Sequence, residues 1–184
     1  MEVILYTALF APLIGSVFGI PFGAKRKFLF VGVFASLMLF VSFVASLLLL
    51  VYAYQCGVLE VVMMDWLGAG RLYIPFGFLI DSVSATMVFV VTLVSLCVHI
   101  YSIGYMNNDK NFNRFFVYLS AFVFSMLILV MSDNFAGLFI GWEGVGLCSW
   151  MLIGFWYERD SASFAANEVF VLNRIADLGW LFGI

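Results

Sequence analysis

The sequence predicts an all-α fold, a polytopic bundle of transmembrane helices. Of its 184 residues, 65% are hydrophobic and 10% are charged, and a water-soluble domain needs more polar residues than this to cover its surface. The hydrophobic residues also form runs of the length that a helix needs to cross a bilayer, about 20 residues. The alternating segments of about ten residues that build a transmembrane β-barrel are absent. Lipid is therefore the predicted solvent for most of the chain.

Six runs are long enough to be candidate membrane helices. They lie at about 3–22, 28–53, 78–103, 115–132, 136–157 and 164–184. No linker or internal repeat divides them, so we expect a single transmembrane domain over residues 1–184. The sixth run has no cap or flanking charge after it. We therefore expect that helix to be truncated and the chain to be the N-terminal part of a longer subunit.

Basic residues predict the orientation of the bundle. They lie in every second connection: Lys25, Arg26 and Lys27 after the first run, Lys110 and Arg114 after the third, and Arg159 after the fifth. The opposite connections contain only Arg71. Because lysine and arginine are enriched on the cytoplasmic side of a membrane, we expect the N-terminus to face outward. The order of charges is also the reverse of that in a signal peptide, because Glu2 precedes the first run.

The outward loop at about 55–77 is rich in turn residues. Within it, Glu60-Val-Val-Met63 and Arg71-Leu-Tyr-Ile74 are predicted to pair as a short hairpin. Asp81 follows this loop and is expected to cap the third helix or to lie in its first turn.

Composition and cysteine spacing exclude several functions. The net charge of −3 and the absence of a basic patch exclude nucleic acid as a partner. The cysteines, Cys56, Cys97 and Cys148, form no pattern that could hold zinc, haem or an iron–sulfur cluster. No residues suited to flavin or nicotinamide are evident either. We therefore expect no metal, cofactor or redox centre in this chain.

Three ionisable residues stand out within the predicted membrane helices: Glu143 in the fifth, and Arg174 and Asp177 in the sixth. A charge near the bilayer centre costs roughly 2.5–3.5 kcal/mol, so each of them needs a reason. Glu143 lies roughly 10 Å of helix rise from the start of its run, too deep for a short side chain to reach the interface. A carboxyl group at this depth can be neutral while isolated and can ionise when a cation or water approaches. We therefore favour a proton site at Glu143 over a carboxyl that only ties two helices together.

A stripe of small residues lies on another face of the fifth predicted helix. Gly137, Gly141, Gly144 and Cys148 fall within about 60° of one another on a helical wheel, and Glu143 points roughly 130° away. Small residues allow helices to approach closely. The packing face and the carboxylate face are therefore expected to be separate.

Arg174 and Asp177 are three residues apart, so they can form an ion pair on one face of the sixth helix. Because a buried pair adds little net stability, we favour a switchable role over a purely structural one. His99, near the inner end of the third helix, is a candidate for a proton relay because histidine titrates near neutrality. For a single histidine, a hydrogen-bonded packing role is the favoured alternative.

The strongest resemblance to a known family lies in residues 141–157, which read Gly-Trp-Glu-Gly-Val-Gly-Leu-Cys-Ser-Trp-Met-Leu-Ile-Gly-Phe-Trp-Tyr. Four further stretches support it in the same order: Asp81 to Met87, His99 to Met106, Asn113 to Phe116 and Asn173 to Asp177. In these residues the chain closely resembles the L subunit of proton-pumping NADH:quinone oxidoreductase, respiratory complex I, an antiporter-like membrane subunit. The resemblance covers about residue 78 to the end, and the first two helices match it only in hydropathy.

The resemblance implies proton translocation coupled to quinone reduction, with Glu143 on the proton path and Arg174 and Asp177 as the family's ion pair. It implies partners, namely other membrane subunits of complex I and the lipid bilayer, in a bacterial inner membrane or an equivalent energy-coupling membrane. NADH, FMN, iron–sulfur clusters and quinone are then expected in partner subunits. The family's essential lysine lies on the next helix, beyond residue 184, so these residues alone are not expected to form a complete channel. Trp150 replaces a tyrosine usual in the family, a departure that touches neither site.

Two other functions remain open at this point. The large subunit of multisubunit cation/proton antiporters resembles this family strongly and would share Glu143. A non-transporting membrane scaffold protein would use the same buried charges only to join helices. Proton coupling that survives neutralisation of these charges would favour the scaffold.

Overall fold

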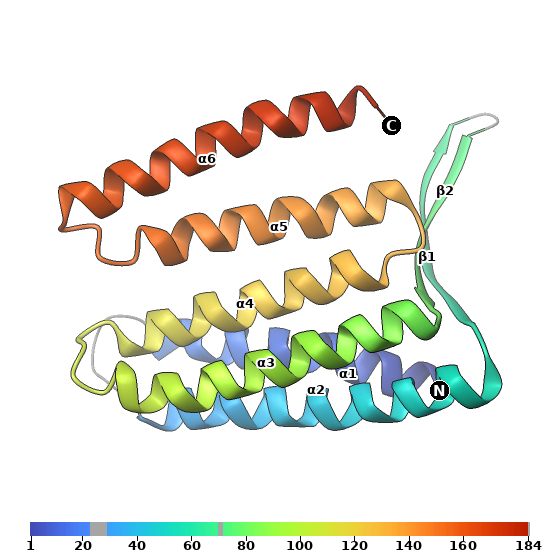
Figure 1. Ribbon diagram of the computed structural model, residues 1–184, viewed down its shortest axis with the longest axis horizontal. Helices are drawn as coiled ribbons and strands as arrows, with labels where there is room; N and C mark the ends of the chain where they lie inside the picture. The colour runs from blue at the N-terminus through green and yellow to red at the C-terminus, as the bar shows by residue number, and fades with distance from the viewer. Residues whose placement is uncertain (23–28, 70–71, 184) are drawn as a thin grey trace.

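The computed structural model describes residues 1–22, 29–69 and 72–183. Its elements, in chain order, are α1 (Glu2–Gly19), the short 3₁₀ helix η1 (Ile20–Phe22), α2 (Leu29–Cys56), β1 (Leu59–Ala69), β2 (Leu72–Ile80), α3 (Ser82–Tyr105), α4 (Phe112–Met131), α5 (Phe135–Ile153) and α6 (Asp160–Leu181). The α-helices lie side by side in an elongated bundle, with the N-terminus and the β-hairpin at the same end (Figure 1). The predicted all-α helix bundle is confirmed.

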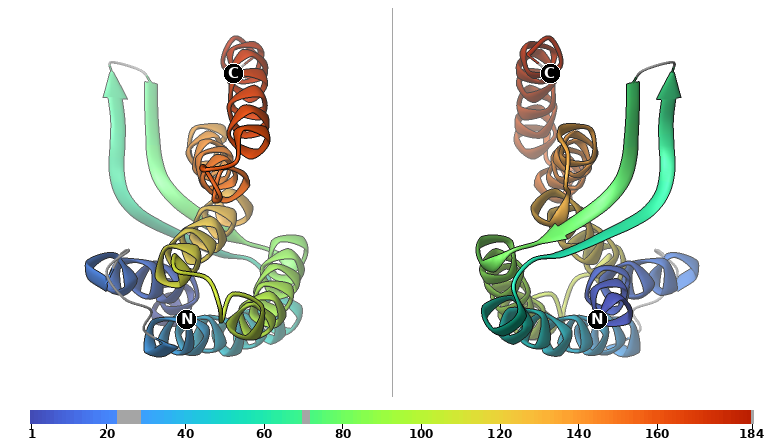
Figure 2. Two further views of the ribbon diagram at one scale, coloured as in Figure 1. Left: turned by 90° about the vertical axis from the view of Figure 1, so that its left-hand side faces the viewer. Right: turned by 90° about the vertical axis from the view of Figure 1, so that its right-hand side faces the viewer.

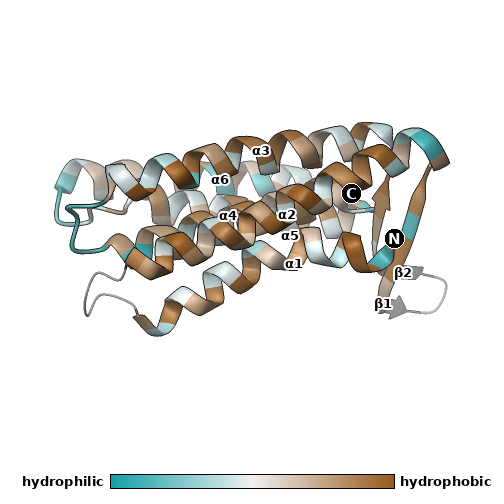
Figure 3. Cartoon of the chain, turned by 90° about the horizontal axis from the view of Figure 1, so that it is seen from below, coloured by the Kyte–Doolittle hydropathy of each residue, from teal (hydrophilic) through white to brown (hydrophobic). Residues whose placement is uncertain are grey.

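Within the described residues, five helices are long and apolar enough to cross a membrane: α1 with η1, α2, α3, α4 and α5. Apolar residues dominate along the helices, and hydrophilic residues gather at the ends of the bundle (Figure 3). α6 has the necessary length but carries Glu168, Arg174 and Asp177 in its central and C-terminal turns. The sixth predicted helix therefore exists, and its passage across the membrane stays a prediction.

The observed helices differ from the predicted ones mainly at their ends. α3 begins at Ser82, not near residue 78, because residues 78–80 belong to β2. Asp81 caps α3, as expected: its Oδ1 accepts the Ser84 N–H at 2.7 Å, and the Asp81 N–H donates to Ser84 Oγ at 2.8 Å. The hydrogen bonds from Ser84 hold the pKa of the Asp81 carboxyl below its ordinary value.

The predicted hairpin is present, but it is longer and has a different register. β1 and β2 pair antiparallel, with Glu60 opposite Leu79. The predicted pairing of residues 60–63 with residues 71–74 is therefore wrong, and the strands extend the predicted loop at about 55–77 to residue 80. Arg71 itself lies outside the described residues.

Burial at the base of the hairpin explains this register. Val61, Phe78 and Ile80 are almost fully buried against the helices, and a shift of one residue would turn such side chains to the opposite face. From this base the hairpin crosses the end of the bundle and reaches the level of α5 and α6 (Figure 2). β2 thus continues to Ile80, through residues that the sequence alone placed at the start of the third helix.

The small-residue stripe of α5 packs against α4. Its members are Gly137, Gly141, Gly144 and Cys148. A Cβ atom on Gly141 would lie 2.5 Å from the backbone nitrogen of Leu129, and one on Gly144 would lie 2.7 Å from Oγ of Ser125. The two helices therefore approach as closely as the stripe predicted. α6 packs mainly on α5 and lies at the edge of the bundle (Figure 2).

Candidate functional site: a charge cluster between two helices

Three charged side chains, called the charge cluster below, meet between α5 and α6: Glu143, Arg174 and Asp177. Nη1 of Arg174 lies 3.1 Å from Oδ2 of Asp177 and also contacts Oε2 of Glu143. One guanidinium nitrogen thus lies between two carboxylates from two different helices. The structure brings all three of these sequence-predicted residues into one site.

Helical spacing on both elements produces this geometry. Arg174 and Asp177 lie three residues apart on α6, where the i,i+3 relation places them on one face. Glu143 lies on the part of α5 that meets α6, away from the small-residue stripe of α5 that packs against α4. Phe170, one turn before Arg174, supports the guanidinium, whose central carbon lies 4.6 Å from the ring centroid.

A fourth residue, Trp142, completes the surroundings of Asp177. Its indole Nε1–H donates to Oδ1 of Asp177 at 2.8 Å. Asp177 is the buried member at 7% exposure, whereas the side chains of Arg174 and Glu143 are 31% and 29% exposed. Sequence reasoning missed Trp142, because a tryptophan in a membrane helix is ordinarily interpreted as part of an interfacial belt. The one signal in the sequence that could have pointed to Trp142 was its position directly before Glu143.

The charge cluster contains more carboxylates than cations. With every group ionised it carries two negative charges and one positive charge, and among the described residues no second cation forms an ion pair with Glu143 or Asp177. An unbalanced charge is expensive inside a membrane. One further cation, or a proton on one of the carboxylates, would balance the cluster.

His99 lies elsewhere, between α3 and α4, and is fully buried. Its Nδ1 lies 2.9 Å from the carbonyl oxygen of Ser95, and its Nε2 lies 3.2 Å from Oγ of Ser120. Because a carbonyl only accepts hydrogen bonds, Nδ1 carries the proton, and the Ser120 hydroxyl can donate to Nε2. This arrangement fits a neutral imidazole in a packing role. The structure does not bring His99 to the charge cluster, and its part in proton transfer stays a prediction.

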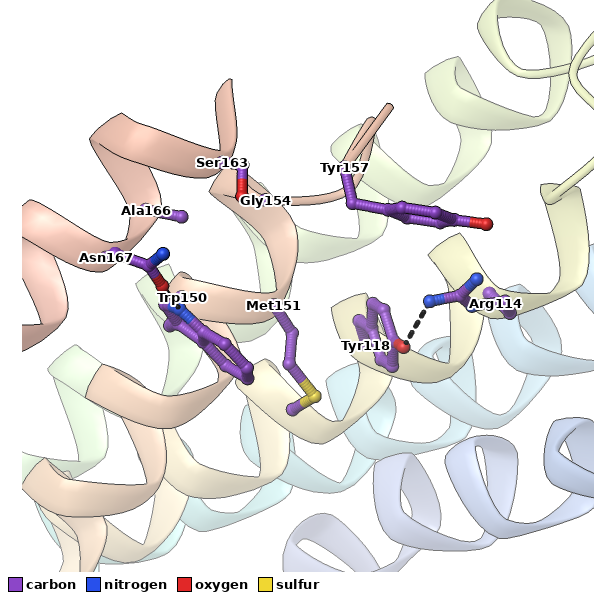
Figure 4. Close-up of a pocket in the computed structure, with 9 residues that line it drawn as sticks. All are labelled: Arg114, Tyr118, Trp150, Met151, Gly154, Tyr157, Ser163, Ala166 and Asn167. Carbon is purple, nitrogen blue, oxygen red and sulfur yellow. Dashed lines mark hydrogen bonds between the residues drawn. The ribbon is translucent and has the colours of Figure 1, made fainter. Parts of the chain in front are cut away.

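A separate cavity of about 230 Å³ lies among α4, α5 and α6 at the end of the bundle opposite the hairpin. Arg114 lies in it between two aromatic rings, with its central guanidinium carbon 5.7 Å from the ring centroids of Tyr118 and of Tyr157 (Figure 4). Nη2 of Arg114 also donates to the Tyr118 hydroxyl at 3.1 Å. No residue of the charge cluster lines this cavity.

Within the part of the chain that the structure describes, no group of three or more His, Cys, Asp or Glu side chains is arranged to hold a metal ion. The three cysteines are free thiols: Cys56 and Cys97 are exposed, and Cys148 is buried.

Fold and site together define a class of protein: a polytopic membrane protein that holds an ionisable cluster between two neighbouring helices. Two family models match this chain. Residues 66–116 match the N-terminus of NADH-ubiquinone oxidoreductase (complex I) chain 5. Residues 132–184, which contain the whole charge cluster, match the transmembrane family of NADH:quinone oxidoreductase and Mrp antiporters.

Curated relatives narrow the class. NADH-quinone oxidoreductase subunit L of Campylobacter jejuni is 52% identical over 184 residues, which are 100% of this chain and 30% of that protein. NADH-ubiquinone oxidoreductase chain 5 of Chondrus crispus is 42% identical, over 96% of this chain and 27% of its own length. The chain belongs to this family, subunit L or chain 5 of complex I, and spans about 30% of the length of the Campylobacter relative.

A solved structure supports the fold independently. The chain is similar to a chain of the membrane-bound sulfane sulfur reductase, an archaeal respiratory membrane complex, with a TM-score of 0.78 over 100% of this chain and 36% of that chain. The sequence identity is 16%, so this likeness concerns the fold alone.

Proposed function

We propose that the chain is part of a proton-translocating membrane subunit of NADH:quinone oxidoreductase, in which Glu143 binds and releases the proton. The observation that carries this proposal is the contact of one guanidinium, that of Arg174, with two carboxylates. Quinone reduction and any redox cofactors would reside in partner subunits, and no step proposed here runs through them. The membrane partners and the energy-coupling membrane implied by the family belong to the same proposal.

The chemistry follows from the charge balance of the cluster. While Arg174 stays with Asp177, the carboxyl of Glu143 can hold a proton on Oε and remain neutral in the membrane. When Arg174 moves toward Glu143, the positive charge favours the carboxylate, and Oε gives its proton to a water molecule. Arg174 therefore acts as an internal cation that selects which of two carboxylates is ionised.

Substitution of Glu143 in the complete protein tests this proposal. Glu143→Gln keeps the size and hydrogen-bonding capacity of the side chain but cannot release a proton, so the complex should assemble and lose most of its proton translocation. Glu168→Gln is the matched control, because it removes an exposed carboxylate of α6. Normal translocation by Glu143→Gln would leave only the scaffold function, in which the cluster joins helices.

A cation/proton antiporter subunit is the second candidate, because the family model over residues 132–184 also covers Mrp antiporters. A relative that is similar along the whole chain is an oxidoreductase subunit, which favours the first proposal. Cation transport in the absence of electron transfer would support the antiporter function.

A further inference from the structure

We infer that Trp142 is a positioning residue, whose indole N–H holds Asp177 so that Arg174 stays shared between Asp177 and Glu143. This inference rests on the proposed function, because it extends the same charge cluster by one residue. The geometry that points to it is a hydrogen bond from α5 to a buried carboxylate on α6.

Asp177 is held from two helices at once. Trp142 on α5 donates to Oδ1 at 2.8 Å, and Arg174 on α6 donates to Oδ2 at 3.1 Å. An indole N–H is a donor only, so a carboxylate oxygen satisfies it fully. Loss of that donor would remove the hydrogen bond that links Asp177 to α5 and would free the carboxylate to rotate.

Packing of the indole ring does not account for this contact. Trp142 is 54% exposed, so about half of the residue is not covered by the helices. Other ring pairs join the same two helices, namely Phe139 with Trp180 and Trp150 with Phe170. What distinguishes Trp142 is the bond to the least exposed member of the charge cluster.

The position of Asp177 affects Glu143 through Arg174. If Asp177 turns away, Glu143 becomes the remaining carboxylate in contact with Arg174 among the described residues. A glutamate that is permanently paired with arginine no longer exchanges its proton during turnover. Trp142 would thus affect Glu143 only through Asp177 and Arg174, without itself taking part in proton transfer.

The test compares two tryptophans of α5 in the complete, membrane-embedded complex. Trp142→Phe keeps an aromatic ring and removes the N–H group. Trp150→Phe is the matched control, because Nε1 of Trp150 also donates to an α6 side chain, Oδ1 of Asn167 at 3.2 Å, but outside the charge cluster.

Both variants should assemble, since the other ring contacts between α5 and α6 persist. Proton translocation should fall about tenfold in Trp142→Phe, the scale of a lost hydrogen bond to a charged group, and its pH profile should move. In Trp150→Phe, proton translocation should stay within about twofold of that of the unmodified protein, and its pH profile should not move. Equal behaviour of the two variants would overturn the inference.

Two further measurements keep the outcome decisive. If Trp142→Phe fails to assemble, β-(3-benzothienyl)alanine is placed at position 142, because it retains the shape of tryptophan without the N–H donor. Proton translocation should remain low in this variant, and full recovery would overturn the inference.

Glu143→Gln is measured in parallel. If that variant loses translocation while Trp142→Phe keeps it, only the role of Trp142 fails; if Glu143→Gln translocates normally, the proposed function fails as well.

Discussion

At the scale of single residues, the proposed proton site depends on Arg174 having two carboxylate partners. The i,i+3 spacing predicts the pair with Asp177, but nothing in the sequence predicts that the same nitrogen also reaches Glu143 on the preceding helix. Contact between two helices depends on their relative rotation, which a single-helix pattern does not specify. The same reason explains why Trp142 was missed and why the partners of His99 could not be named.

The shared arginine predicts a non-additive set of substitutions. Glu143→Gln or Asp177→Asn alone leaves Arg174 with one carboxylate, so either single variant should assemble almost normally. The double variant leaves the arginine without a carboxylate partner in the cluster and should cost about 3–5 kcal/mol, with loss of assembled complex. Adding Arg174→Gln to the double variant removes the unpaired charge, so it should restore assembly but not proton translocation. Quantifying assembled complex in membranes checks this, and a double variant that assembles like the single ones would contradict it.

At the scale of elements, the helices were predictable because each apolar run had to be long enough to cross a bilayer. The ends were less predictable, because only the short polar segment from Asp81 to Ser84 separates the apolar end of β2 from the apolar run of α3. The glycine stripe predicted a close helix contact but not its partner, α4, and this contact sets the position of α5 on which Glu143 depends.

The first prediction at the scale of elements concerns the close approach of α5 to α4. Gly141→Ala would place a Cβ atom 2.5 Å from the Leu129 backbone, which cannot move aside as a flexible side chain would. We expect a loss of about 1–3 kcal/mol, measured as a lower thermal stability of the purified protein. Gly146→Ala is the control, because a Cβ there has no neighbour within 4 Å. Equal stability of the two variants would contradict the packing described for α5.

The second concerns the cap of α3 and its pH dependence. Asp81→Ala should cost about 1 kcal/mol at neutral pH. The pKa of Asp81 is lowered by the bonds from Ser84, so this stabilisation is present above the ordinary pKa of the carboxyl and is lost as the pH falls through the lowered value. Hydrogen exchange of the first turn of α3 checks both points. Protection that is equal in the unmodified protein and in Asp81→Ala at neutral pH would show that the cap contributes nothing.

At the scale of the whole molecule, the structure gathers Lys110, Arg114 and Arg159 at one end of the bundle and the N-terminus and hairpin at the other (Figure 1). Lys25, Arg26 and Lys27 lie outside the described residues. The fold could be predicted from hydropathy because the bilayer constrains element length and leaves few alternatives. The direction of the bundle in its membrane is a proposal that rests on these basic residues.

Accessibility labelling tests that direction. In a variant without the native cysteines, Lys110→Cys should be protected from an impermeant thiol reagent added outside the cell, because basic connections stay on the cytoplasmic side. Gly68→Cys, on the exposed hairpin, should react. The reverse pattern would invert the orientation while leaving the fold and the charge cluster unchanged.

The claim that Glu143 gains and loses a proton is tested most directly by infrared difference spectroscopy of the complete membrane complex during turnover. A protonated carboxyl has a carbonyl stretch that a carboxylate lacks, so the account predicts a difference band in this region. The band should be absent in Glu143→Gln and present in Glu168→Gln. A carboxyl band that persists unchanged in Glu143→Gln would contradict the account, because the proton would then be carried by another group.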